Sequence, residues 1–287
     1  MKSFHFALLG GDVSYSRSPD IFRAVFNELG REGRFDLCPT QPERLEAAVK
    51  NLVTSGVTGF SVTIPHKQTI IQYLNSADEL VHATGAVNSV AVRDGSLHGY
   101  NTDCCGFAFA LKQAEFDGCE QALVLGAGGA AGAVAHTLSV DFGVRNFVLC
   151  GRNVERLSNL KNILSARSQH IMTQIVMVSK YADQCPSDNR LVVNCTPLGG
   201  PLFPDISPIP PGLDWSTVGL YFDLNYNPDN SAVMLAKEAG VKAVDGSSML
   251  VAQALKSMEL WTGLHVDYDN VYRQVFPHPN ATQSREV

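Results

Sequence analysis

Residues 122–132, ALVLGAGGAAG, decide the fold of this chain. Ala122 to Leu125 form a short apolar run that predicts a strand buried on both faces, and a glycine-rich turn begins directly after it. Gly126, Gly128 and Ala131 fill the spacing G-x-G-x-x-G/A, and the residues that follow are helix formers. This order predicts a dinucleotide-binding unit, in which the helix N-terminus holds the pyrophosphate. The alternative is a tight strand-to-helix turn without a ligand.

The end of the next strand indicates which dinucleotide binds. Residues 146–150, NFVLC, predict that strand, and Gly151, Arg152, Asn153 and Arg156 follow it without an acidic residue at the strand end. A carboxylate at this place binds the ribose of NAD, whereas arginines bind the 2′-phosphate of NADP through charge-assisted bonds. The sequence therefore favours NADP. The alternative is that both arginines are solvated side chains beside a surface helix.

The composition is typical of a cytoplasmic enzyme. The chain has 287 residues, 45% hydrophobic and 17% charged, which predicts two domains with a core each. A net charge of −6 without a basic run argues against a nucleic-acid partner. The longest uncharged apolar stretch, 122–135, is shorter than the roughly 20 residues that cross a membrane. The seven cysteines form no C-x-x-C pair, so we expect neither disulfides nor a metal site, and the first residues lack a secretory signal.

Strands and helices alternate along both parts of the chain. In the first part we expect helices at 19–29, 42–54 and 65–74, and strands at 4–9, 35–38, 58–63, 87–92 and 97–100. After a helix at 103–113, the second part has expected strands at 123–125, 147–150, 174–178, 191–194, 218–223 and 242–244. Residues 197–211, rich in Pro and Gly, predict a loop near the cofactor.

The pattern predicts an α/β protein of two domains. Residues 1–103 form a mixed-sheet domain for substrate binding and catalysis, and residues 104–246 form a doubly wound Rossmann domain for NADP. Residues 247–287 then form helices that return to the first domain, with Val251, Leu255, Met258 and Trp261 on one apolar stripe.

Polar residues follow the strands of the first domain, where α/β proteins bind ligands. They are Ser16 and Ser18, Thr63 and Lys67, Asn88, and Asn101 with Asp103. Each has a structural alternative. The serines and Asp103 are residues that cap helices, and Lys67 is also typical of a solvated first helical turn.

Taken together, these segments closely resemble the shikimate dehydrogenase family over nearly all of residues 1–276. The matching segments are Ser16-Arg17-Ser18-Pro19, 62–67 (VTIPHK), 85–88 (GAVN), 101–103 (NTD), 126–131 (GAGGAA), 151–156, 194–196 (NCT), 226–228 (YNP) and 249–253 (MLVAQ). This chain departs from the usual residues at Tyr15, Ser61, Ser89, Gly151, Asn153 and Gly200.

The resemblance implies an enzyme that interconverts 3-dehydroshikimate and shikimate with NADP, in the pathway to chorismate and the aromatic amino acids. It implies Lys67 and Asp103 as catalytic residues. The implied substrate-binding residues are Ser16, Ser18, Thr63, Lys67, Asn88, Asn101, Asp103, Tyr226 and Gln253. The implied cofactor-binding residues are Gly126, Ala127, Gly128, Gly129, Ala130, Ala131, Arg152, Asn153, Arg156, Cys195, Thr196, Gly246 and Met249, with no metal.

Two other functions stay open at this point. One is a quinate or quinate/shikimate dehydrogenase, although a pair of serines in the first loop favours shikimate. The other is a catalytically silent NADP-binding regulator, against which the presence of both Lys67 and Asp103 argues. We expect a small-molecule substrate, no membrane or nucleic-acid partner, and a monomer or a homodimer.

Overall fold

A computed structural model describes residues 3–166, 168–184, 191–227 and 229–277 of the chain. These residues fall into two compact units. Unit 1 takes the described residues within 1–78, 87–102 and 251–287, and unit 2 takes those within 79–86 and 103–250. The short segment 79–86 thus belongs to unit 2, although it lies inside the range expected for the first domain.

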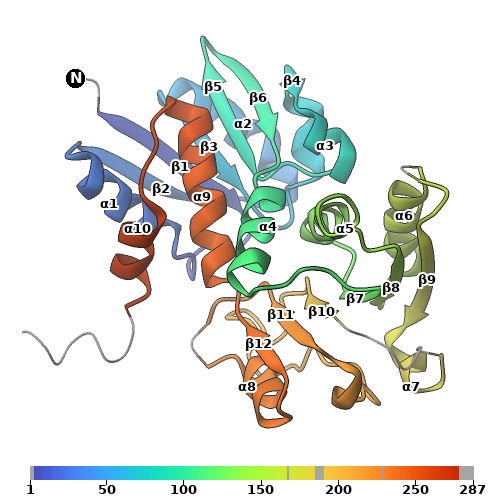
Figure 1. The fold of residues 1–287 in the computed structure, drawn as a ribbon. Helices are drawn as coiled ribbons and strands as arrows, with labels where there is room; N and C mark the ends of the chain where they lie inside the picture. Colours follow the sequence, from blue (N-terminus) through green and yellow to red (C-terminus); the bar gives the residue numbers. More distant parts are fainter. Residues whose placement is uncertain (1–2, 167, 185–190, 228, 278–287) are drawn as a thin grey trace, which may run out of the picture. The chain divides into compact units, whose positions relative to one another are not determined.

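Unit 1 contains a mixed sheet with the strand order β2-β1-β3-β5-β6-β4 (Figure 1). The strands are β1 (Phe4–Gly10), β2 (Gly33–Pro39), β3 (Gly59–Val62), β4 (Ser76–Ala77), β5 (Ser89–Arg93) and β6 (Ser96–Tyr100). β1 is parallel to β2 and β3, whereas β5 is antiparallel to β3 and β6. The mixed sheet predicted from the sequence is confirmed, and β4, which pairs with β6, is an addition to it.

Aromatic packing joins a C-terminal helix to this sheet. The helical segments of unit 1 are α1 (Ser18–Leu29), the 3₁₀ turn η1 (Pro42–Arg44), α2 (Leu45–Thr54), η2 (Thr69–Tyr73), α10 (Tyr268–Val275) and, from residue 251 on, α9 (Ser247–Thr262). The ring of Trp261 on α9 lies 4.9 Å from that of Phe6 and 5.5 Å from that of Phe22. A Cβ atom at Gly59 would overlap the Trp261 indole, so only glycine allows this contact between strand and helix.

The helix expected over residues 65–74 is not formed. Of this range, the structure folds only Thr69–Tyr73 into a 3₁₀ helix. The main-chain oxygens at the start of the segment bond elsewhere, because Ile64 O accepts from Gly11 N at 2.8 Å and Lys67 O accepts from Val87 N at 2.7 Å. Hydrogen bonds to neighbouring segments therefore replace the intrahelical bonds.

Unit 2 contains a parallel sheet with the strand order β12-β11-β10-β7-β8-β9 (Figure 1). The strands are β7 (Gln121–Leu125), β8 (Asn146–Gly151), β9 (Met172–Met177), β10 (Leu191–Asn194), β11 (Leu220–Asp223) and β12 (Lys242–Val244). The helical segments are α3 (Glu79–Thr84), α4 (Asp103–Gln113), α5 (Gly129–Asp141), α6 (Val154–Ser165), η3 (Val178–Lys180), α7 (Tyr181–Gln184), η4 (Trp215–Thr217), α8 (Ser231–Glu238) and the first residues of α9. The predicted doubly wound sheet is confirmed, whereas α3 was not expected from the sequence.

The central strand β7 has a core on each face. Ala122 and Val124 belong to one buried cluster, and Leu123 and Leu125 belong to another on the opposite side of the sheet. The strand order also reverses beside β7, because β8 lies on one side and β10 on the other. Such a switch point, at the carboxyl ends of the strands, is where open α/β sheets bind ligands.

Within the described ranges, no helix is both long and apolar enough to span a membrane.

Candidate active site

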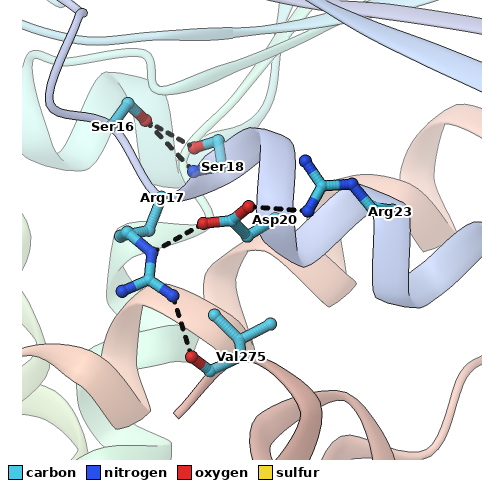
Figure 2. A network of polar contacts seen from close by, with 6 residues as sticks. All are labelled: Ser16, Arg17, Ser18, Asp20, Arg23 and Val275. Atoms are coloured by element: carbon cyan, nitrogen blue, oxygen red, sulfur yellow. Dashed lines mark hydrogen bonds and ion pairs between the residues drawn. The ribbon is translucent and has the colours of Figure 1, made fainter.

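The loop after β1 carries the two serines of the S-x-S-P segment (Figure 2). The Ser16 and Ser18 hydroxyls lie 3.1 Å apart, and Ser18 N donates to Ser16 Oγ at 3.2 Å. Arg17 is the N-cap residue of α1, and no side chain caps this helix. Ser16 therefore supports the first residue of the helix without being its cap, and the structure brings both hydroxyls together as a polar pair.

Arg17, between the two serines, connects this loop to the end of α10 (Figure 2). Its Nε donates to Asp20 Oδ2 at 2.8 Å and its Nη2 donates to Val275 O at 2.9 Å. The guanidinium also lies over the ring of Phe276, 5.1 Å from the ring centre. The Arg17 side chain thus bonds the serine loop to α1 through Asp20 and to α10 through Val275.

The segment that carries Lys67 is held by its neighbours. Thr63 N donates to the main-chain oxygen of Leu9 at 2.9 Å, and the buried His66 ring places Nε2 2.7 Å from Thr40 O. Because a carbonyl oxygen only accepts, His66 Nε2 carries the proton in this bond. The Lys67 side chain is partly exposed, and the segment around it is not helical. The alternative of a first-turn helical lysine is therefore wrong.

Four buried polar side chains meet where β5 begins and β6 ends. They are the expected substrate residues Asn88 and Gln253 together with Thr102 and Ser257, which the motifs did not assign to the site. Asn88 Nδ2 lies 2.9 Å from Thr102 Oγ1 and 3.1 Å from Gln253 Oε1. The sequence does contain a signal for Ser257, because it follows Gln253 by four residues and so lies on the same face of a helix. In the structure both side chains are buried, whereas Leu255 of the expected apolar stripe is only partly buried.

The other expected substrate residues lie in both units. Asn101 is 2% exposed and follows β6 in unit 1. Asp103, 5% exposed, is the first residue of α4 in unit 2. Tyr226 is partly buried in the loop after β11, also in unit 2, while Pro228 of the same segment lies outside the described residues.

Two departures from the family pattern are neighbours in the sheet. Ser61 of β3 is the cross-strand partner of Ser89 of β5. Both are buried, and Ser89 Oγ makes no hydrogen bond to any residue that the structure describes. Adjacent positions on one face of a sheet pack against each other, so these two substitutions form a single local change.

The glycine turn of unit 2 fits a pyrophosphate. Gly126 has a φ of 102°, and a Cβ atom there would lie 2.9 Å from Thr196 Cγ2, so this turn requires glycine. Gly128 is the N-cap of α5, where no side chain accepts from the first N–H groups, and a Cβ atom at Gly128 would meet nothing within 4 Å. Ala131 is fully buried under the turn. The N-terminus of α5 thus offers main-chain N–H groups and open space to an anion.

The strand end of β8 presents positive charge. Arg152 and Arg156 are both exposed, and neither forms an ion pair with any residue in the described ranges. Asn153, also expected at the cofactor, is the N-cap of α6, and its Oδ1 accepts from Arg156 N at 3.0 Å. Two arginines at this place fit a phosphate group, and Asn153 fixes the start of the helix that carries the second one.

A buried carboxylate organises the loop after β10. Asp223 at the end of β11 is fully buried and accepts from Asn194 Nδ2 at 3.0 Å and from Asn225 Nδ2 at 2.8 Å. Asn194 Oδ1 in turn accepts from Thr196 N at 3.0 Å and Oγ1 at 2.7 Å. Burial raises the pKa of the Asp223 carboxyl, while the hydrogen bonds act in the opposite direction. This network places Cys195 and Thr196 beside the glycine turn, and the sequence did not reveal it.

Gly246 and Met249 lie close to the same loops. Gly246 N donates to Asn225 O at 2.9 Å, and a Cβ atom at Gly246 would overlap the main-chain oxygen of Leu224. Met249 is buried in the cluster that also contains Ala131 and Cys195. Ala127, Gly129 and Ala130 are partly exposed in the turn and at the start of α5. Among the described residues no group of three His, Cys, Asp or Glu side chains could hold a metal ion.

A parallel sheet of this order with a glycine turn at its switch point defines a Rossmann-type dinucleotide-binding protein. A family model for the shikimate dehydrogenase substrate binding domain matches residues 8–90, and one for the shikimate 5′-dehydrogenase C-terminal domain matches residues 246–276. The shikimate dehydrogenase (NADP(+)) of Caldanaerobacter subterraneus subsp. tengcongensis is 35% identical over 277 residues, which cover 94% of this chain and 95% of that protein. The chain belongs to the shikimate dehydrogenase family.

Solved structures support the same assignment. Shikimate dehydrogenase 1 from Peptoclostridium difficile has a TM-score of 0.84 at 28% identity, with 95% of this chain and 97% of that chain covered. Shikimate 5-dehydrogenase from Thermus thermophilus, solved in complex with NADP(H) and shikimate, has a TM-score of 0.78 at 30% identity, with 95% and 98% covered.

Proposed function

We propose that this chain is an NADP-dependent oxidoreductase that interconverts 3-dehydroshikimate and shikimate. The observation that carries the proposal is that the chain combines the polar residues of the S-x-S-P, VTIPHK and NTD segments with a dinucleotide turn. The 35% identity to a curated shikimate dehydrogenase (NADP(+)) over 94% of this chain supports the substrate, the cofactor and the place in the aromatic pathway.

Recognition of the substrate begins with its carboxylate and ring hydroxyls. The adjacent Ser16 and Ser18 hydroxyls donate to the carboxylate, with Tyr226 as a further donor. Thr63, Asn88, Asn101 and Gln253 bind ring hydroxyls. A site built from buried polar groups rejects analogues that lack a hydroxyl, because its own groups are then left unpaired.

The chemical step needs a proton donor at the reacting oxygen. The bound dinucleotide supplies the hydride for the carbonyl carbon. Lys67 donates a proton to the oxygen that becomes the hydroxyl, and its positive charge stabilises the negative charge that develops there. The lysine then regains a proton from solvent, and the reverse reaction uses the same groups in the opposite order. The proposed role of Asp103 is to orient the Lys67 side chain toward the reacting oxygen.

Cofactor selection rests on the strand end of β8. The exposed Arg152 and Arg156 bind the 2′-phosphate of NADP, the N-terminus of α5 binds the pyrophosphate, and Cys195, Thr196, Gly246 and Met249 complete the site. We place the enzyme in the cytoplasm, as a monomer or a homodimer. The six cysteines in the described ranges are thiols and not disulfides, which fits a reducing compartment.

The test is an initial-rate assay of the purified chain with shikimate and with quinate, each with NADP and NAD. We expect kcat/KM to be highest for shikimate with NADP. A preference for quinate would assign the enzyme to the other activity of its superfamily. Tight NADP binding in a calorimetric titration without turnover of either acid would instead indicate a regulator and would overturn the proposal.

A further inference from the structure

The buried network of unit 1 is continuous from a strand to a helix. Asn88, Thr102, Gln253 and Ser257 are 2%, 2%, 9% and 0% exposed. Besides the contacts of Asn88 Nδ2, Thr102 N lies 2.6 Å from Asn88 Oδ1, the Thr102 and Ser257 hydroxyls lie 3.0 Å apart, and Ser257 Oγ lies 2.9 Å from Gln253 O. Such a network has a unique set of donors and acceptors if main-chain groups fix its ends.

The main chain fixes the direction of the bonds at the strand end. A main-chain N–H can only donate, so the Asn88 atom 2.6 Å from Thr102 N is its oxygen, and the amide nitrogen of Asn88 faces Thr102 Oγ1 and Gln253. The Gln253 atom that accepts from this nitrogen must then be Oε1. The orientation of both amides therefore follows from one main-chain donor.

The main chain also fixes the direction at the helix end. The Gln253 main-chain oxygen can only accept, so Ser257 uses its one hydroxyl proton on that oxygen. In the 3.0 Å contact between the two hydroxyls Thr102 is therefore the donor and Ser257 the acceptor, and Gln253 Oε1 is a second, more distant acceptor for Thr102 at 3.5 Å. The Thr102 oxygen is left to accept from Asn88, as its 2.9 Å distance requires. Both hydroxyls thus contact Gln253, Thr102 at the side-chain oxygen over 3.5 Å and Ser257 at the main-chain oxygen.

We propose that Thr102 and Ser257 are positioning residues that hold the Gln253 side-chain amide with its oxygen on Asn88 and its N–H donors toward the substrate. Gln253 then recognises an oxygen acceptor of the ring. Its selection of ligands that carry this acceptor depends on the Thr102 and Ser257 hydroxyls, which do not contact the substrate themselves. This inference rests on the proposed function, because it takes shikimate as the ligand of Gln253.

Steady-state kinetics of Thr102→Val test this role. The valine keeps the shape of threonine but removes the hydroxyl, so that Asn88 loses an acceptor and the Gln253 amide loses its support. We expect the shikimate KM to rise about tenfold, the effect of about one buried hydrogen bond, while kcat and the NADP KM change less than about twofold. Thr102→Ser, which retains the hydroxyl, should have a shikimate KM close to that of the parent.

Thr262→Val is the matched control. Thr262 Oγ1 donates to Met258 O at 2.8 Å, four residues earlier on α9. Ser257 makes the same kind of bond to Gln253 O, but Thr262 lies outside the network. This variant should have parent kinetics. If Thr102→Val does not fold, Ser257→Ala carries the test with the same criteria. A shikimate KM within about twofold of the parent, or equal losses in kcat and both KM values, overturns the proposal.

A second measurement needs no substrate. In protein with ¹⁵N-labelled glutamine side chains, the Gln253 amide protons should exchange with solvent about tenfold faster in Thr102→Val than in the parent and in Thr262→Val. Equal exchange in all three proteins overturns the positioning role. If the parent does not turn over shikimate, the proposed function fails, and the exchange rates alone still decide whether the hydroxyls position Gln253.

Discussion

Arg17 Nη2 donates to the main-chain oxygen of Val275 at 2.9 Å, a bond between residues 258 positions apart in the sequence. Arg17 stands between the serines expected to bind the substrate carboxylate, and Val275 ends α10. The last helix that the structure describes, α10, is therefore bonded to the loop after β1 (Figure 2).

Replacement of Arg17 should affect substrate binding more than turnover. Arg17→Met removes the bonds to Asp20 and Val275 and frees the serine pair, so we expect the shikimate KM to rise about threefold to tenfold with little change in kcat. Arg23→Met is the control, because Arg23 also bonds to Asp20, at 2.9 Å, but does not reach α10. Equal KM values in the two variants would show that the contact with Val275 has no influence on the loop.

Lys67→Ala should abolish most of the turnover. A proton donor that stabilises charge in the transition state contributes roughly 10²-fold or more to kcat, whereas binding of the ground state depends on Ser16, Ser18 and Gln253. Steady-state kinetics, with folding checked by circular dichroism, should therefore show a large loss in kcat and a small change in the shikimate KM. A folded variant with parent turnover would remove Lys67 from the mechanism.

Asp103→Asn keeps the shape of the side chain but removes its charge. If Asp103 acts through Lys67, both residues serve the same step. The double variant Lys67→Ala, Asp103→Asn should then have a kcat only slightly below that of the slower single variant. Multiplied losses in kcat would instead indicate two independent contributions.

Arg152→Asp should weaken NADP and leave NAD nearly unaffected. Each charge-assisted bond to the 2′-phosphate contributes about 1.5–3 kcal/mol, and the new carboxylate repels the phosphate, so the Kd for NADP should rise at least about tenfold. Lys161→Asp makes the same change of charge on α6, and it should alter NADP binding much less. Equal losses for NADP and NAD in a fluorescence titration would show that Arg152 has a structural role.

Asp223→Asn should disturb the cofactor loop. The groups around the carboxylate are all donors, so the new NH₂ group leaves one of them without an acceptor, at a cost of about 1–3 kcal/mol of unfolding free energy. We expect the NADP KM to rise more than the shikimate KM. In Tyr221→Phe only the 2.8 Å bond from the phenol is lost, and the NADP KM should stay near the parent value.

The pH dependence of this carboxylate has a definite sign. Burial raises the pKa of Asp223 in the folded chain, which therefore binds more protons than the unfolded chain, and this contribution to stability is lost as the pH rises through the folded pKa. Compared with Asp223→Asn, the parent should lose unfolding free energy as the pH rises from about 4, near the pKa of an unfolded aspartate, toward neutrality. Urea titrations at both ends of this range measure the difference, and a gain in the parent would contradict the burial effect.

The parallel sheet was readily predicted from the sequence because its strands are local and strongly apolar. The turn after Leu125 and the arginines after Cys150 were found for the same reason, since each motif occupies only a few residues. The segment around Lys67 was predicted incorrectly because the main-chain oxygens of Ile64 and Lys67 accept from residues 11 and 87, which interrupts a helix-like sequence. Local propensity cannot anticipate such tertiary bonds.

The candidate site shows the same limit. The motifs identified Asn88 and Gln253 individually, but their contact joins residues 165 positions apart. It lies beside Thr102, which is part of the NTD segment but was given no role in the site. Ser61 and Ser89 were separate exceptions in the sequence, and only the register of β3 and β5 makes them neighbours. Asp223 was absent from the prediction because its distant partner Asn194 reaches it only through the pairing of β10 with β11.

The contact between Trp261 and Gly59 also constrains how the chain can fold during synthesis. Every strand of the first sheet is translated before residue 102, but the indole that covers Phe6 and Phe22 comes only after the whole of the second unit. All residues of the nucleotide-binding unit are therefore synthesised while Phe6 and Phe22 of the first unit are not yet covered by the indole. Unit 1, whose synthesis begins first, therefore completes its core only after unit 2 has been synthesised.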